Sequence, residues 1–151
     1  MGCRVIHKAM RRATFVGIAV FACVVAPAVK ARDLNTITLD CVFEHQNTIN
    51  ITGGAPSKDD TPQKPLLTTI TGLDAKAGRA TMVGNLGSVP LAFFSNGVRW
   101  VFVQITDTGN ATVTSMLDPS TSGEAYAVHS RHMWLLDKGI ISQWAGTCKV
   151  R

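Results

Sequence analysis

The sequence predicts an all-β protein, a single small antiparallel barrel of about eight strands connected mostly by hairpins. Apolar and polar residues alternate with a period of two along most of the chain, as in half-buried antiparallel strands. Turn signals recur about every 8–12 residues, and no segment has a convincing helical period. This spacing is typical of a barrel or a sandwich, so a lipocalin-like barrel and a β-sandwich are the alternatives.

The expected strands follow from this alternation. Residues 36–43 place their apolar side chains on one face, and residues 47–52, rich in Thr and Ile, are expected to be their hairpin partner. Residues 53–64 hold two Pro, two Gly and three charged residues before the final Lys, which predicts a loop. Further strands are expected at residues 66–71, 79–83, 89–94, 98–105, 111–116, 124–136 and 140–148.

Turn residues connect these strands. Asn96-Gly97 tolerates the positive φ of a tight hairpin, and residues 107–110 predict a second one. The glycine-rich stretch from Gly84 to Ser88 opens no helix, so it is interpreted as a turn and not as a phosphate cradle. Residues 98–105 are apolar on both faces, which predicts the central buried strand.

The N-terminus has the order of zones typical of a cleavable signal peptide. Basic residues precede a run of about 13 mostly apolar residues, and small residues follow it. That run is short of the roughly 20 residues that span a bilayer. We expect a signal peptide over residues 1–31, cleaved after Ala28 or Ala31, and a single domain over residues 32–151. A lipoprotein anchored through Cys23 is the weaker reading, because Cys23 lies inside the apolar run.

Removing this segment changes the charge of the chain. The full sequence has a net charge of +5, but five of its 15 basic residues and none of its ten acidic residues precede residue 32. The mature domain is therefore close to neutral. We expect no nucleic-acid partner, and membrane contact only through the signal segment. The expected location is periplasmic or secreted.

Two of the four cysteines remain in the mature domain. Cys41 lies near its start and Cys148 near its end. In an oxidising compartment we expect them to form a structural disulfide that ties the first strand to the last. No second Cys stands at zinc-site spacing, so no metal site is expected from them.

The search for a catalytic constellation finds no nucleophile elbow, P-loop, dinucleotide fingerprint or zinc-protease motif. His129 and His132 are three residues apart, so on a strand they face opposite sides, and they are expected at the surface or at the edge of a cleft. His45 is a third candidate, either as a metal ligand or as a catalytic histidine. We expect no enzyme activity and no cofactor.

The three tryptophans, Trp100, Trp134 and Trp144, are expected in the core. An exposed Trp at a barrel mouth would instead mark a binding site.

Two short motifs resemble those of the periplasmic C-type lysozyme inhibitors. Residues 122–126 (SGEAY) resemble that family's S-G-x-x-Y loop, and Trp134 with Lys138-Gly139 is similar to its W-x-K-G segment, at a spacing two residues longer. One early and one late cysteine are also shared. The family is an eight-stranded barrel that inserts loop Ser and Lys side chains into the lysozyme cleft. The resemblance implies those roles for Ser122 and Lys138, with Tyr126 at the same surface.

These observations predict an exported, non-catalytic barrel that binds a partner or ligand. The most specific version of this hypothesis is an inhibitor of C-type lysozyme. A carrier of a small apolar ligand, of lipocalin type, is the alternative, since eight strands can enclose one small ligand. A structural protein of the cell envelope is a further alternative. An interior cavity of a few hundred Å³ would favour the carrier.

Overall fold

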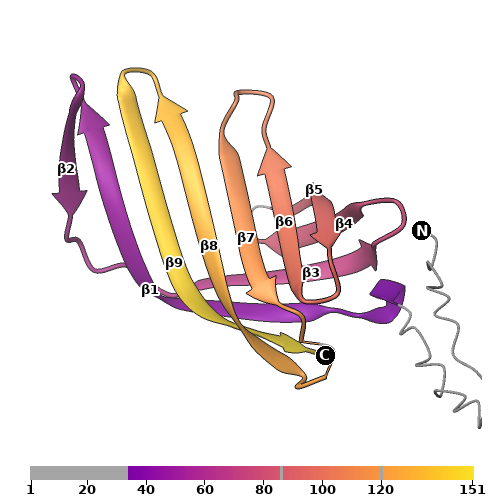
Figure 1. The fold of residues 1–151 in the computed structure, drawn as a ribbon. Helices are drawn as coiled ribbons and strands as arrows, with labels where there is room; N and C mark the ends of the chain where they lie inside the picture. Colours follow the sequence, from indigo (N-terminus) through magenta and orange to yellow (C-terminus); the bar gives the residue numbers. More distant parts are fainter. Residues whose placement is uncertain (1–33, 86, 120) are drawn as a thin grey trace, which may run out of the picture. The chain divides into compact units, whose positions relative to one another are not determined.

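Nine antiparallel strands and one short 3₁₀ helix make up the part of the chain described by the computed structural model, residues 34–85, 87–119 and 121–151 (Figure 1). The expected signal peptide, with Cys23, lies outside these residues. The elements, in chain order, are η1 (Leu34–Thr36), β1 (Leu39–Thr52), β2 (Ala55–Asp59), β3 (Leu66–Asp74), β4 (Arg79–Gly84), β5 (Gly87–Ser95), β6 (Arg99–Ile105), β7 (Ala111–Leu117), β8 (Glu124–Leu135) and β9 (Lys138–Val150).

The strands form one closed sheet. Their order is β2-β1-β3-β4-β5-β6-β7-β8-β9, and β1 pairs in addition with β9. β1 and β3 to β9 therefore make a closed eight-stranded antiparallel barrel. β2 is an extra strand that pairs with the second half of β1. This confirms the predicted all-β barrel and excludes the sandwich. The described residues contain no helix long and apolar enough to cross a membrane.

The contact between β1 and β9 closes the barrel. Residues 39–52 pair with residues 138–150, and Cys41 stands directly opposite Cys148. These two cysteines form a disulfide with a Cα–Cα distance of 4.0 Å, and both are buried. The predicted structural disulfide between the first and last strands is confirmed.

β1 differs from its prediction. Residues 36–43 and 47–52 were expected to be two strands of a hairpin, but they belong to one 14-residue strand, and Thr36 lies in η1. The register with β9 shifts between Phe43 and His45, so Glu44 is an extra residue in the ladder. This bulge breaks the period of two, and the break has the same sequence signature as a turn.

The predicted loop at residues 53–64 also contains a strand. β2 pairs with Thr48–Thr52 of β1, and its register places Pro56 opposite Ile51. A proline and a charged Lys58 are acceptable there because β2 is an edge strand, whose outer side needs no ladder hydrogen bonds. The composition of residues 53–64 indicated a loop. Residues 55–59 nevertheless form a strand, because the second half of β1 provides a partner for it.

Large rings fill one end of the barrel. Trp100, Phe93 and Phe102 are each 0–1 % exposed; the Phe93 and Phe102 rings stack at 4.9 Å, and Trp100 meets Phe93 edge-on at 5.7 Å. Leu34 of η1 packs against the buried core. The predicted central strand is therefore present as β6, although only its inner face is fully buried and Ile105 is 72 % exposed.

The hairpin signal at Asn96-Gly97 is confirmed. Gly97 has a φ of 79°, and the side chain of Asn96 accepts hydrogen bonds from the backbone N–H groups of Val98 and Arg99. Trp100 and Trp144 are buried as expected. Trp134 is not: it is 64 % exposed, and it pairs with Gly139 near the tip of the β8–β9 hairpin, where its ring lies close to that glycine.

We expect Gly146→Ala to destabilise the protein by about 3 kcal/mol or more. A Cβ at Gly146 would collide with the carbonyl oxygen of Val42 and would lie 2.6 Å from Cα of Phe43, so the backbone at the β1 bulge would have to move. Chemical denaturation measures the effect.

Gly84→Ala is the matched control, because a Cβ there meets nothing within 4 Å and its φ is not positive. This variant should be neutral or more stable by about 0.5 kcal/mol. Equal stability of the two alanine variants would contradict the steric role assigned to Gly146.

Replacing both Cys41 and Cys148 by Ala should lower the free energy of unfolding by about 4–5 kcal/mol, because the bridge spans 107 residues of chain. Urea unfolding of the oxidised wild type and of the double variant measures this difference. A loss below about 1 kcal/mol would mean that the β1–β9 ladder alone determines closure.

Candidate functional site

The end of the barrel opposite the ring cluster is hollow. A cavity of about 400 Å³ lies there and is lined from β3, β4, β5, β6 and β8. We call this cavity the barrel mouth. Its apolar side chains come from three consecutive strands, Leu66 of β3, Met82 of β4 and Val89 of β5, and its polar side chains include Thr68, Gln104, His129 and Arg131.

The mouth is hollow because its wall carries small residues. Gly84 and Gly87 face each other where β4 and β5 meet, and both line the cavity. Gly84 shares its strand face with Ala80 and Met82, so a side chain at this position would project into the mouth. Gly87 has a φ of 111°, a conformation that favours glycine. Gly84, Asn85 and Gly87 of the turn predicted at residues 84–88 thus also line the cavity.

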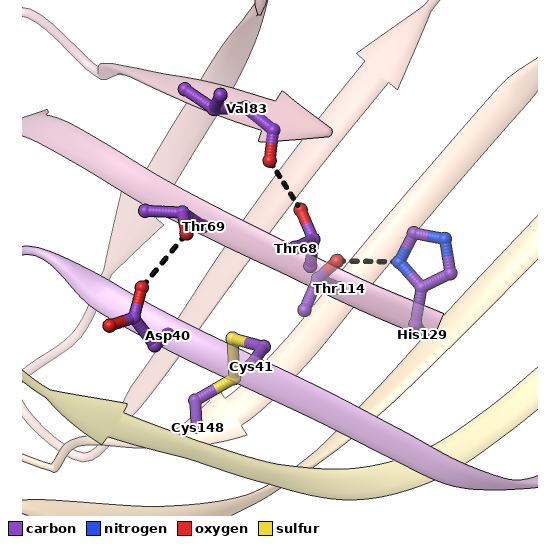
Figure 2. The surroundings of a disulfide bond; sticks show 8 residues. All are labelled: Asp40, Cys41, Thr68, Thr69, Val83, Thr114, His129 and Cys148. Atoms are coloured by element: carbon purple, nitrogen blue, oxygen red, sulfur yellow. Dashed lines mark hydrogen bonds between the residues drawn. A yellow bond between two sulfur atoms is a disulfide. The ribbon is translucent and has the colours of Figure 1, made fainter. Parts of the chain in front are cut away.

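His129 is the most buried polar side chain of the mouth, at 1 % exposure. Its Nδ1 lies 2.8 Å from the hydroxyl oxygen of Thr114 on β7 (Figure 2). The centres of the Phe43 and Trp144 rings each lie 5.5 Å from the centre of its ring. Its Nε2 has no hydrogen-bond partner among the described residues. A buried nitrogen left unpaired costs about 1–3 kcal/mol. The described residues hold one other such nitrogen, Nε1 of Trp100 in the packed end of the barrel.

Burial, together with the positive charge of Arg131, lowers the pKa of His129 from 6.5 to about 4. The ring is therefore neutral at physiological pH and carries a single N–H. The direction of the hydrogen bond between the Thr114 hydroxyl and Nδ1 depends on the tautomer of the ring. In the tautomer in which the hydroxyl donates to Nδ1, Nε2 carries the proton and is an unused donor.

Arg131 lies two residues after His129 on the same face of β8. Its guanidinium carbon stands 5.4 Å from the centre of the Trp144 ring, a cation–π contact. The four ion pairs of the described residues all involve other cations, and the residues that line the mouth include no Asp or Glu. The mouth therefore holds one half-buried positive charge without a carboxylate.

The histidine predictions are partly confirmed. His129 and His132 do face opposite sides of β8, with His132 exposed. His129 lines the cavity, as the cleft-edge alternative predicted, but its side chain is almost fully buried and not at the surface. His45 is exposed beside the β1 bulge. Within the described residues, no three His, Cys, Asp or Glu side chains are grouped so that they could hold a metal ion.

The residues implied by the lysozyme-inhibitor resemblance do not come together. Ser122 lies in the loop before β8, where its hydroxyl donates to the carbonyl of Glu124, and Lys138 begins β9 at the far end of the β8–β9 hairpin. The 12 residues of β8 separate them by roughly 35 Å. Tyr126, on the outer face of β8, is 81 % exposed. Ser122 and Lys138 therefore lie at opposite ends of β8, and Tyr126 lies near the Ser122 end.

Sequence reasoning missed Arg131, Met82, Gln104 and Thr68 as parts of one site. The period of two on β8 places Arg131 on the face of His129, which was a usable signal. Nothing local indicated that the inner faces of β3 and β8 share a cavity, because that depends on barrel closure.

Comparison with known protein families, curated proteins and solved structures finds no match to this chain.

His129 should make stability depend on pH. Its pKa is lower in the folded state, about 4, than in the unfolded chain, 6.5, so the unfolded chain takes up the proton first as the pH falls. The contribution is fully present above pH 6.5 and is lost as the pH falls towards 4, by about 3 kcal/mol in total.

Urea unfolding at a series of pH values between 7.5 and 4, for wild type and His129→Phe, measures this contribution. We expect the wild type to lose more stability over that range than the variant, whose buried ring cannot titrate. Parallel curves would contradict a buried neutral histidine.

Proposed function

We propose that this chain is an exported, non-catalytic binding protein whose barrel mouth takes a small ligand with an apolar body. The observation that carries this proposal is the cavity of about 400 Å³, which falls within the usual size of small-molecule sites, about 300–1,000 Å³. The buried disulfide agrees with an oxidising compartment.

The division of the barrel interior supports this function over a structural role. A barrel that served only as a scaffold would gain stability from filling its interior, since close packing is the rule in protein cores. Here Trp100, Phe93 and Phe102 fill one end, and the other end carries Gly84 and Gly87 in its wall.

The lining matches the expected ligand. Leu66, Met82 and Val89 present apolar surface on one side of the mouth, and burying apolar ligand atoms there is worth about 0.8 kcal/mol per methylene. The flexible thioether of Met82 adapts to ligands of different shapes. Polar groups stand on the β6 and β8 side and would orient the ligand.

The test uses 1-aminoanthracene, an uncharged apolar probe that becomes more fluorescent when it leaves water. We expect saturable binding to the wild type and at least a tenfold weaker affinity for Gly84→Phe. A Cβ at this position meets nothing within 4 Å, and the face of β4 that Gly84 shares with Met82 directs the added ring towards the mouth.

Val83→Phe is the matched control, because Val83 is the neighbouring residue on the opposite, exposed face of β4. This variant should bind the probe as the wild type does. If Gly84→Phe also binds the probe normally while remaining folded, the mouth is not the binding site and the proposal fails.

A further inference from the structure

We propose that the ligand of the barrel mouth is an amphipathic monocarboxylic acid, whose carboxylate is held by Arg131 and His129 while its apolar chain lies against β3, β4 and β5. This inference rests on the proposed function and adds the chemical class of the ligand. It is drawn from the distribution of charge, unused hydrogen-bond donors and apolar surface within the cavity.

Arg131 favours an anion. Its side chain is half-buried in the wall of the mouth, the lining contributes no acidic residue, and the ion pairs of the described residues leave it out. A guanidinium withdrawn from water gains most from a carboxylate, which it binds through two parallel hydrogen bonds. The contact with the Trp144 ring limits the positions that the guanidinium can take.

His129 provides the second donor. Its ring is held by the Thr114 hydroxyl at Nδ1 and by the neighbouring Phe43 and Trp144 rings, so Nε2 has a defined orientation. This nitrogen is buried and has no partner among the described residues, although its residue lines the cavity. Because almost none of the surface of this atom is accessible, a ligand oxygen reaches it only when a neighbouring side chain moves aside, and the oxygen would then satisfy it.

The two donors stand on one strand face. Residues two apart on a strand point to the same side about 7 Å apart, which the long side chain of Arg131 can bridge towards His129. A single carboxylate can therefore contact both. The single positive charge of the lining argues for one carboxylate rather than two.

The wall opposite β8 indicates that the rest of the ligand is apolar. Leu66, Met82 and Val89 lie on β3 to β5, across the barrel from β8, so a bound acid would extend from the polar wall to the apolar wall. The cavity volume of about 400 Å³ lies near the lower end of the usual range for small-molecule sites, so a saturated acid of about ten carbons is a suitable probe.

Three ten-carbon probes with different head groups test this inference by isothermal titration calorimetry at pH 7.5: decanoate, decan-1-ol and decylamine. We expect decanoate to bind the wild type at least tenfold more tightly than decan-1-ol, and decylamine to bind most weakly. Arg131→Gln should remove the preference for decanoate and leave the affinity for decan-1-ol within twofold of the wild type.

Arg99→Gln is the charge-matched control, because Arg99 is an exposed residue at the start of β6, outside the mouth. It should retain the tenfold preference. His129→Phe keeps a ring between Phe43 and Trp144 and should weaken decanoate about fivefold without changing decan-1-ol. Should that variant not fold, Arg131→Gln, with its half-buried side chain, still decides the question.

The outcomes separate the two proposals. Equal affinities for decanoate and decan-1-ol, tighter binding of decylamine, or a decanoate preference that survives Arg131→Gln would each overturn the carboxylate inference and leave ligand binding in the mouth intact. No binding of any probe, together with unchanged 1-aminoanthracene binding in Gly84→Phe, would overturn the proposed function itself.

Discussion

The pairing of β1 with β9 is the contact on which the rest of this structure depends. It joins the first and last strands of the sheet, removes two open edges and encloses an interior. Two local features make the contact possible. Gly146 lets the backbone of β9 pass close to Val42 and Phe43 where β1 bulges, and the Cys41–Cys148 disulfide fixes the register beside that point.

Closure creates a volume that the side chains fill unevenly. At one end the rings of Trp100, Phe93 and Phe102 pack together and supply the apolar burial that stabilises a small domain. At the other end the wall includes Gly84 and Gly87, which have no side chains to fill the interior, and a cavity remains. The division lets the packed end hold the fold while the hollow end stays accessible to a ligand.

The polar groups of the hollow end are arranged at a cost to stability. His129 keeps a neutral, buried ring with one unpaired nitrogen, and Arg131 keeps a half-buried charge without a carboxylate. Groups that are unfavourable in the free protein become favourable when a complementary ligand arrives, because it supplies the missing hydrogen bonds and charge. The ring contacts of Trp144 with both residues hold these groups in place beforehand.

The sequence by itself determined the all-β class, seven of the nine strands to within a few residues, the turn at Asn96-Gly97 and the disulfide. These features depend on local alternation, on turn chemistry or on the count of cysteines. Tertiary structure decided the others. β2 became a strand because β1 offered it an edge, and residues 36–52 became nearly one strand because a bulge kept their ladder with β9 continuous. The mouth brings together Met82, Gln104 and Arg131 from separate strands, since only closure of the barrel decides which inner faces meet and which side chains leave space between them.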